Sequence, residues 1–285
     1  IDPLGRKGVR TEHDDKGRLA RIIDGNGNVT NLGFDTNASV QTITDANGNP
    51  TTLVYDNRGN IISEINALSG VTQRTYDANN NLLSVKDPLG NTATYTYDSR
   101  GNLLSETNGL NQTTTYTYNN LNKVVTVTDP LGNKTQNSYD SQGNLLTTTD
   151  AAGQITTYVY NSQGNVTSVT NPQRDVTRYE YDSQGLITAI IDALNQKSQL
   201  TYDSNGNLLS TTTPLGNTTR FTYDSENRLA TVTDALGNVS RIEYNASGDR
   251  TATIDALGRR TEYSYDNQKQ LTQIRYPDGT TEVFT

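Results

Sequence analysis

Short segments in which apolar and polar residues alternate recur every 21 residues along the chain. Residues 92–97 place Ala93, Tyr95 and Tyr97 on one face of a predicted strand and three threonines on the other. In residues 103–107, aliphatic residues stand six and seven positions after the tyrosine and so fall on opposite faces. This second strand is therefore predicted to be buried on both faces or to carry a β-bulge.

One aromatic position fixes the register of the repeat. Tyrosine occupies it at residues 55, 76, 97, 118, 139, 160, 181, 202, 223, 244 and 265. Stepping back by 21 residues reaches Phe34 and then His13, the only histidine in the chain. Thirteen gapless repeats thus span residues 13–285 as one predicted repeat domain, and residues 1–12 are predicted to be part of a preceding repeat. The chain begins inside this pattern, which predicts a piece of a longer polypeptide.

Two turns separate the predicted strands in each repeat. The residue after the aromatic is Asp or Asn, and the fourth is Gly or Asn in eleven of thirteen repeats, with Ala38 and Lys269 as exceptions. Gly and Asn tolerate a left-handed backbone, so we expect a turn at this position. A second cluster, Asp-Pro-Leu-Gly-Asn at residues 87–91 and 129–133, has the residue order of another turn.

Two strands and two turns per repeat predict an all-β fold, a continuous antiparallel meander of hairpins with about 26 strands. A β-solenoid in which each 21-residue repeat forms one coil is the alternative. The two differ in the distance between equivalent tyrosines, about 9.6 Å in a meander and about 4.8 Å in a solenoid.

Composition and charge narrow the function classes. The net charge of −8 disfavours nucleic-acid binding, which needs clustered positive charge, and the basic residues near both ends are interpreted as solvated. The chain has no cysteine and no apolar run long enough for a membrane span. No cofactor is expected.

The tyrosine–aspartate pair is the first candidate for chemistry, but its repetition denies it the unique environment that a catalytic pair needs. We expect the tyrosines to pack on one another and the acidic residues to open turns, a role that Asn119, Asn161 and Asn245 can also fill. The predicted structural residues are Tyr55, Asp56, Tyr76, Asp77, Tyr97, Asp98, Tyr139, Asp140, Tyr181, Asp182, Tyr202, Asp203, Tyr223, Asp224, Tyr265 and Asp266.

Other candidate sites are weaker. His13 stands in the aromatic register and is interpreted as a variant stacking residue, with no second histidine or cysteine to share a metal. Residues 203–207 begin like a calcium loop, but Pro214 stands where an EF-hand needs glutamate. Tyrosines beside Asn and Asp could also stack on sugars, although burial of these rings in the sheet is favoured.

Together, the period and the residue order resemble the Rhs/YD-repeat family. Its unit, Gly followed by Tyr-x-Tyr-Asp and Gly-x-Leu, is found here as Gly90, Tyr95, Tyr97-Asp98 and Gly101 to Leu103. The chain differs in preferring asparagine after the turn glycine, where many family members carry arginine.

This resemblance implies a β-sheet of hairpins that curls into a spiral or hollow shell, as in bacterial Rhs proteins, toxin-complex components and teneurins. Rhs shells end with a self-cleaving Asp-Pro-x-Gly-Leu pattern, and residues 2–5, 87–90 and 129–132 match four of its letters. Arg6, Asn91 and Asn133 replace its final leucine, so these segments are interpreted as turns rather than processing sites.

The prediction from the sequence is a non-enzymatic scaffold, a shell segment of a large secreted or cell-surface bacterial protein that encloses or displays another segment. The expected partners are the rest of the parent chain or an enclosed cargo, and open sheet edges invite self-association. The alternative is an extracellular binding module for glycans or a partner protein. Exposed rings at Tyr97, Tyr139, Tyr181 and Tyr223 would favour binding, and buried rings would favour the scaffold.

Overall fold

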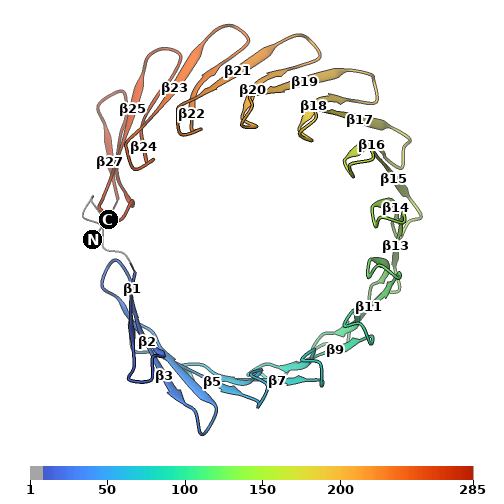
Figure 1. Ribbon diagram of the computed structural model, residues 1–285, viewed down its shortest axis with the longest axis vertical. Helices are drawn as coiled ribbons and strands as arrows, with labels where there is room; N and C mark the ends of the chain where they lie inside the picture. Colours follow the sequence, from blue (N-terminus) through green and yellow to red (C-terminus); the bar gives the residue numbers. More distant parts are fainter. Residues whose placement is uncertain (1–8, 285) are drawn as a thin grey trace. The chain divides into compact units, whose positions relative to one another are not determined.

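The computed structural model describes residues 9–284, which form 27 β-strands and no helix. The chain divides into two compact units, Ile1–Gln154 and Ile155–Thr285. Within each unit every strand pairs antiparallel with the next one in the chain, and the resulting sheet is curved (Figure 1). The predicted meander is confirmed, and the β-solenoid alternative is wrong, because strands of one repeat pair with each other rather than with their counterparts in the next repeat.

The strands are short and regular. Those of the first unit are β1 Arg10–His13, β2 Leu19–Ile23, β3 Val29–Asp35, β4 Val40–Thr44, β5 Pro50–Tyr55, β6 Ile61–Ile65, β7 Val71–Tyr76, β8 Leu82–Lys86, β9 Thr92–Tyr97, β10 Leu103–Thr107, β11 Thr113–Tyr118, β12 Val124–Thr128, β13 Lys134–Tyr139 and β14 Leu145–Thr149. Those of the second unit are β15 Ile155–Tyr160, β16 Val166–Thr170, β17 Val176–Tyr181, β18 Ile187–Ile191, β19 Lys197–Tyr202, β20 Leu208–Thr212, β21 Thr218–Tyr223, β22 Leu229–Thr233, β23 Val239–Tyr244, β24 Arg250–Ile254, β25 Arg260–Tyr265, β26 Leu271–Arg275 and β27 Thr281–Val283.

A β-bulge lies at the same place in nearly every repeat. In the hairpin of β9 and β10, Tyr97 pairs with Leu103 and Thr96 pairs with Ser105, so Leu104 is the additional residue. The bulge explains why aliphatic residues stand at both the sixth and the seventh position after the tyrosine. Of the two readings left open by the sequence, the bulge is the one that the structure shows.

The register gives the sheet two different faces. Tyr95 pairs with Glu106 and Tyr97 with Leu103, so tyrosines and aliphatic residues share one face, which we call the tyrosine face. The opposite face, here the threonine face, carries hydroxyl pairs such as Thr96 with Ser105, whose oxygens lie 2.6 Å apart. Neither unit contains a helix or a second sheet among residues 9–284. Each unit is therefore a single layer.

The single layer leaves almost every side chain partly accessible. Ala189 and Ala252 are the buried hydrophobic residues of the described chain, and both lie on the threonine face between longer side chains. Ala252, for example, pairs with Glu243 on one side and Glu262 on the other. Stability therefore depends on contacts between neighbouring hairpins rather than on an enclosed core.

The left-handed turn position is occupied by glycine in most turns, but not in all. Arg174 has a φ of 71° there, and the steric contact between the β-carbon and the backbone in that conformation raises the free energy of the folded state. In the turn after Phe34, Ser39 rather than Ala38 takes the positive φ, and β3 pairs with β4 without a bulge. Ala38 lies within this turn as expected, and only the residue with the left-handed backbone is displaced by one position.

Replacing Arg174 with glycine is expected to stabilise the second unit by about 0.5–1 kcal/mol, because relief of the left-handed strain exceeds the added flexibility of the unfolded chain. Urea unfolding would measure the change. Gln173→Gly, in the same turn but without a positive φ, is the control and should not stabilise. A lower midpoint for Arg174→Gly would contradict this assignment of strain.

Candidate functional site

The turn after each tyrosine is built around one carboxylate. In residues 98–102, the Asp98 N–H donates to the Asn102 carbonyl and the Gly101 N–H donates to the Asp98 carbonyl. Asp98 Oδ1 accepts the N–H groups of Arg100 and Asn102, each at 2.9 Å, and Oδ2 accepts the Asn102 side-chain amide at 2.9 Å. Gly101 has a φ of 83°, which completes a type I turn with a glycine bulge. The carboxylate is thus used within the turn.

These hydrogen bonds stabilise the ionised carboxylate. The side-chain amides of Asn60 and Asn102, with backbone N–H groups, lower the pKa values of Asp56 and Asp98 to about 2. In further turns an asparagine amide four residues on likewise lowers the pKa of the aspartate. Those aspartates are Asp24, Asp45, Asp77, Asp87, Asp129, Asp140, Asp203 and Asp234. A group held ionised in this way is a poor general base near neutral pH.

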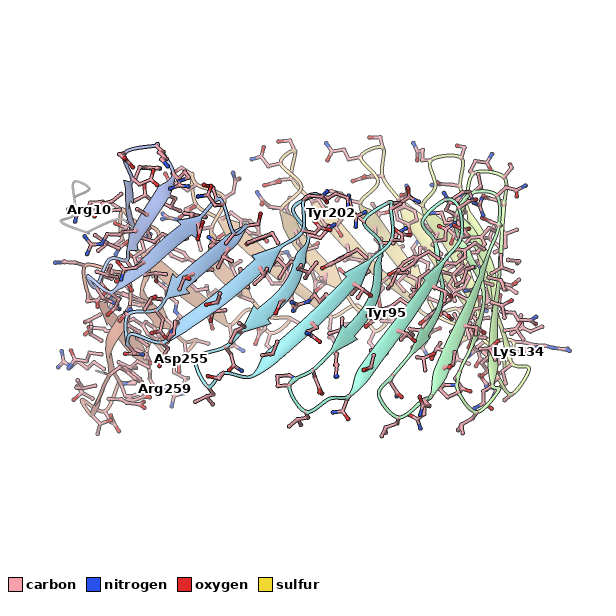
Figure 2. The ribbon with its side chains drawn as sticks, turned by 90° about the horizontal axis from the view of Figure 1, so that it is seen from below. Arg10, Tyr95, Lys134, Tyr202, Asp255 and Arg259 are labelled. Atoms are coloured by element: carbon pink, nitrogen blue, oxygen red, sulfur yellow. The ribbon has the colours of Figure 1, made fainter. Side chains whose placement is uncertain are left out.

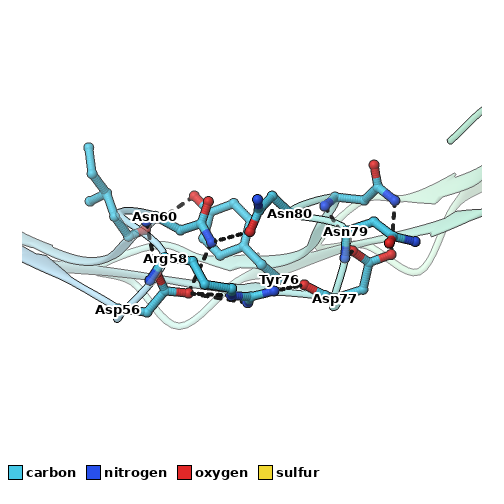
Figure 3. A network of polar contacts seen from close by, with 9 residues as sticks. Asp56, Arg58, Asn60, Tyr76, Asp77, Asn79 and Asn80 are labelled. Carbon is cyan, nitrogen blue, oxygen red and sulfur yellow. Dashed lines mark hydrogen bonds and ion pairs between the residues drawn. The ribbon is translucent and has the colours of Figure 1, made fainter.

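Side chains also join several of the turns that follow the tyrosines to the next such turn, along one rim of the sheet. Arg58 donates to the Asp77 carbonyl, and the Asn60 amide donates to Asn80 Oδ1 at 2.8 Å (Figure 3). Asn102 and Asn122 repeat the second contact at 3.0 Å. We call this edge the polar rim, and its contacts tie successive hairpins together.

The tyrosine hydroxyls form a second regular series of contacts. Tyr118 donates to the Leu103 carbonyl at 2.8 Å, beyond the point at which pairing of β10 with β11 ends. The same contact to a carbonyl 15 residues earlier, at 2.6–3.2 Å, is made by Tyr76, Tyr139, Tyr181, Tyr202, Tyr223 and Tyr244. Each hydroxyl therefore satisfies a carbonyl that the strand ladder does not reach.

The tyrosine face is neither enclosed nor fully exposed. Tyr97, Tyr139, Tyr181 and Tyr223 are all half-buried. The exposure of these rings therefore does not decide between the scaffold, for which buried rings were expected, and the binding module, for which exposed rings were expected. Burial raises the pKa values of Tyr97 and Tyr181. In the second unit this face includes a concavity of about 890 Å³ whose lining includes Val232, Ile242, Thr253 and Tyr276.

Some tyrosine-face positions carry charged residues. Arg250 occupies the sixth position after the tyrosine, which is aliphatic in the other repeats. Its guanidinium lies 4.1 Å from the centre of the Tyr263 ring. Tyr116 donates to Glu106 at 2.6 Å, and this hydrogen bond, with burial, raises the pKa of Tyr116 to about 12. The first pair belongs to the second unit and the second pair to the first unit, and the two pairs share no residue.

The other candidate residues lie apart. His13 is exposed at the end of β1 and pairs with Leu19, as tyrosine pairs with an aliphatic residue in other repeats. Asp203 accepts the N–H groups of Asn205 and Asn207 and the Asn207 amide, so its oxygens close their own turn. No group of three potential metal ligands is present among residues 9–284. No helix of that part of the chain is long and apolar enough to cross a membrane.

The Asp-Pro-Leu-Gly segments form turns with the same hydrogen bonds as the first turn. Asp87 Oδ1 accepts the N–H groups of Leu89 and Asn91, and Gly90 has a φ of 92°. Residues 129–133 repeat this geometry, whereas residues 2–5 lie outside the described part of the chain. In the second unit, Asp255 and Arg259 of the equivalent Asp-Ala-Leu-Gly turn lie at the rim opposite Tyr202 (Figure 2). We call this edge the apolar rim, because its tips carry exposed leucines that the sequence analysis placed in turns without assigning them a role.

Comparison with known sequences agrees with this architecture. The profile of the Teneurin YD-shell family matches residues 6–155 and 138–284, which together span nearly the whole chain. The chain belongs to this family. No curated protein sequence matches it. As a YD-shell chain, it has the repeat and the hairpin sheet expected of a structural shell.

Solved structures of toxin-complex proteins have a similar fold. TcdB2-TccC3 superposes with a TM-score of 0.77 at 19% identity, covering 95% of this chain and 17% of that one. TcdB2-TccC3 without its hypervariable C-terminal region gives 0.78 at 20% identity, with the same coverages. The YD-shell chain thus spans about one sixth of the length of these proteins, and at this identity the likeness concerns the fold alone.

Proposed function

We propose that this YD-shell chain is a wall segment of a larger shell, part of a secreted or cell-surface bacterial protein, and that its tyrosine face covers another segment of the same polypeptide. The half-buried tyrosine face carries the proposal: it holds the largest apolar side chains of the repeats, yet each unit has only one layer. A sheet face of this kind normally packs against a second layer. The role requires no catalytic residue.

The length relationship supports this proposal. Matched toxin-complex chains are about six times longer than the region they share with this chain. One TcdB2-TccC3 structure is described as lacking a hypervariable C-terminal region, which in that protein is a segment additional to the shared region. A parent protein of similar size would supply both further wall and an enclosed segment.

Photo-crosslinking in the parent polypeptide would test the proposal. A photoreactive phenylalanine at Tyr95 projects from the tyrosine face, and the same group at Thr94 projects from the opposite face of the same strand. We expect the group at position 95 to crosslink to a segment of the same parent polypeptide that lies outside residues 1–285. The group at position 94 should not give that product. Equal crosslinking from both faces, or crosslinking of Tyr95 to added glycan or to a separate protein, would refute enclosure and favour the binding-module alternative.

A further inference from the structure

Two glutamates lie on the tyrosine face of the first unit, at equivalent positions of two repeats. Glu64 and Glu106 each stand nine residues after the aromatic position of the repeat, where every other repeat has an aliphatic residue or threonine. Glu64 pairs with Leu53 across its hairpin, and Glu106 pairs with Tyr95. Both glutamates are partly buried. A partly buried charge is costly unless a partner compensates it, so the partners of these two carboxylates indicate what each one still needs.

The two glutamates have different partners. Glu64 forms an ion pair with Arg74, whose Nη2 lies 2.8 Å from Oε2. Ten residues after Glu106 the equivalent position is occupied by Tyr116, whose hydroxyl donates to Oε1 at 2.6 Å. This hydrogen bond, with burial, raises the pKa of Tyr116 to about 12, so the phenol stays neutral and supplies no positive charge. No Lys or Arg among residues 9–284 forms an ion pair with Glu106.

A pocket of about 160 Å³ opens beside Glu106, where the tyrosine face meets the apolar rim. Its lining includes Ala93, Tyr95 and Thr114, and all of its lining residues belong to the first unit. Ala93 stands four residues before Tyr97, and Thr or Ser occupies that position before every other tyrosine of the register. Because alanine is smaller than either, it leaves space at the place where the carboxylate lacks a cation.

We propose that this pocket, the Glu106 pocket, binds the ammonium group of a lysine side chain from the segment that the tyrosine face covers. The inference rests on the proposed function and adds the chemistry of one contact. A lysine ammonium donates three hydrogen bonds, and the lining supplies acceptors in the Glu106 carboxylate, the Thr114 hydroxyl and the Gln112 amide oxygen. The Tyr95 ring, across the hairpin from Glu106, attracts a cation placed over its face.

Charge excludes other occupants of the pocket. A carboxylate or phosphate would be repelled by Glu106, and an apolar side chain would bury the carboxylate without compensating it. Lysine is favoured over arginine because Tyr116 already occupies Glu106 Oε1. A guanidinium binds best when both carboxylate oxygens are free for parallel hydrogen bonds, whereas an ammonium acts as a point charge and needs only one. The contact therefore replaces, from outside these repeats, the cation that Arg74 supplies to Glu64.

Zero-length carbodiimide crosslinking of the parent polypeptide, read by peptide mass spectrometry, would test the proposal. The reagent activates a carboxylate, which then forms an amide with an amine in contact with it. We expect an amide between Glu106 and a lysine outside residues 1–285. Glu106→Gln keeps the size of the side chain and an acceptor for Tyr116, and should abolish this product. Tyr116→Arg should reduce its yield, because it recreates the ion pair of Glu64 with Arg74.

Glu64→Gln is the matched control. Glu64 lies on the same face, but its partner is a guanidinium, which does not form the amide, so this variant should leave the Glu106 product unchanged. Circular dichroism of the 285-residue chain would show that each variant folds. A Glu106 product that Glu64→Gln reduces as strongly as Tyr116→Arg does would contradict a contact specific to this pocket.

The photoreactive group at position 95 separates failure of this contact from failure of the proposed function. Crosslinking of that group to the covered segment without an amide at Glu106 would refute the lysine contact and leave enclosure in place. An amide between Glu106 and a lysine of a separate protein would refute enclosure and with it the source of the lysine proposed here. An amide to a lysine within residues 1–285 would show that the chain supplies its own cation and would overturn the proposal.

Discussion

Lowering the pH from 4 to 2 is expected to lower the unfolding temperature of this YD-shell protein steeply. The turn aspartates have pKa values below their usual range, with Asp56 and Asp98 at about 2, because N–H groups and asparagine amides stabilise their ionised form. A group with a lowered pKa in the folded state contributes stability above its unfolded pKa, near 3.9, and loses it as the pH falls through the folded value. The loss therefore falls between about pH 4 and pH 2.

The number of turns makes this effect large. Ten turn aspartates share the asparagine contact, and they close turns at both rims of the sheet. In a repeat protein whose hairpins contact only their neighbours, protonation weakens every part of the array at once. Thermal melts followed by circular dichroism at pH 5, 4, 3 and 2 would measure the change.

Two controls separate turn chemistry from overall charge. Protonation leaves 23 Lys and Arg residues uncompensated, so melts at low and high salt would reveal the part due to self-repulsion. Asp56→Asn together with Asp98→Asn should reduce the pH dependence, because asparagine keeps the acceptor, as Asn119 does for the N–H of Leu121 at 2.9 Å. An unfolding temperature that is constant from pH 5 to pH 2 would show that the carboxylates do not hold the turns.

Much of the fold follows from local rules that the sequence makes visible. The 21-residue period fixes the register, the Asp and Gly positions fix both turns, and the alternation in residues 92–97 fixes the two faces. Repetition helps because one misread residue is corrected by its twelve counterparts. The bulge was visible in the sequence because aliphatic residues at both the sixth and the seventh position after the tyrosine break the alternation of a strand. Only the backbone pairing could show that Leu104 is the extra residue.

What the sequence missed depends on surroundings rather than on local pattern. The sequence marked Ala38 as an exception at the turn position without showing which residue replaces it there; Ser39 adopts the left-handed backbone, and β3 and β4 pair without the bulge. The leucine in Asp-Pro-Leu-Gly was recognised as part of a turn, yet a turn rule does not say whether its side chain folds back or projects outward. The degree of burial of the tyrosine rings was also undetermined, because it depends on the absence of a second layer within each unit.

Removing the Tyr202 side chain, which makes the contact shared by the tyrosines of the repeat, is expected to cause a large loss of stability. Tyr202 is half-buried, pairs with Leu208 across the hairpin of β19 and β20, and donates to the Ile187 carbonyl at 3.0 Å. Tyr202→Phe removes only the hydroxyl and should cost about 1 kcal/mol, part of it from the unsatisfied carbonyl. Tyr202→Ala also removes the ring contacts and should cost about 2–3 kcal/mol, below the value for a fully buried aromatic.

Tyr179→Phe is the matched control. Tyr179 lies on the same face of the neighbouring repeat, but its hydroxyl makes no hydrogen bond to another of residues 9–284. Its loss should therefore change the unfolding free energy by less than about 0.5 kcal/mol.

Hydrogen exchange would locate the effect of the Tyr202 substitutions. Because each hairpin contacts only its neighbours, faster exchange should be confined to strands around β19, while β9 and β10 of the other unit remain protected. Equal losses for Tyr202→Phe and Tyr179→Phe would show that the carbonyl contacts contribute nothing. Faster exchange throughout both units would show instead that the array unfolds as one cooperative body, in which case the stability of every hairpin depends on all the others.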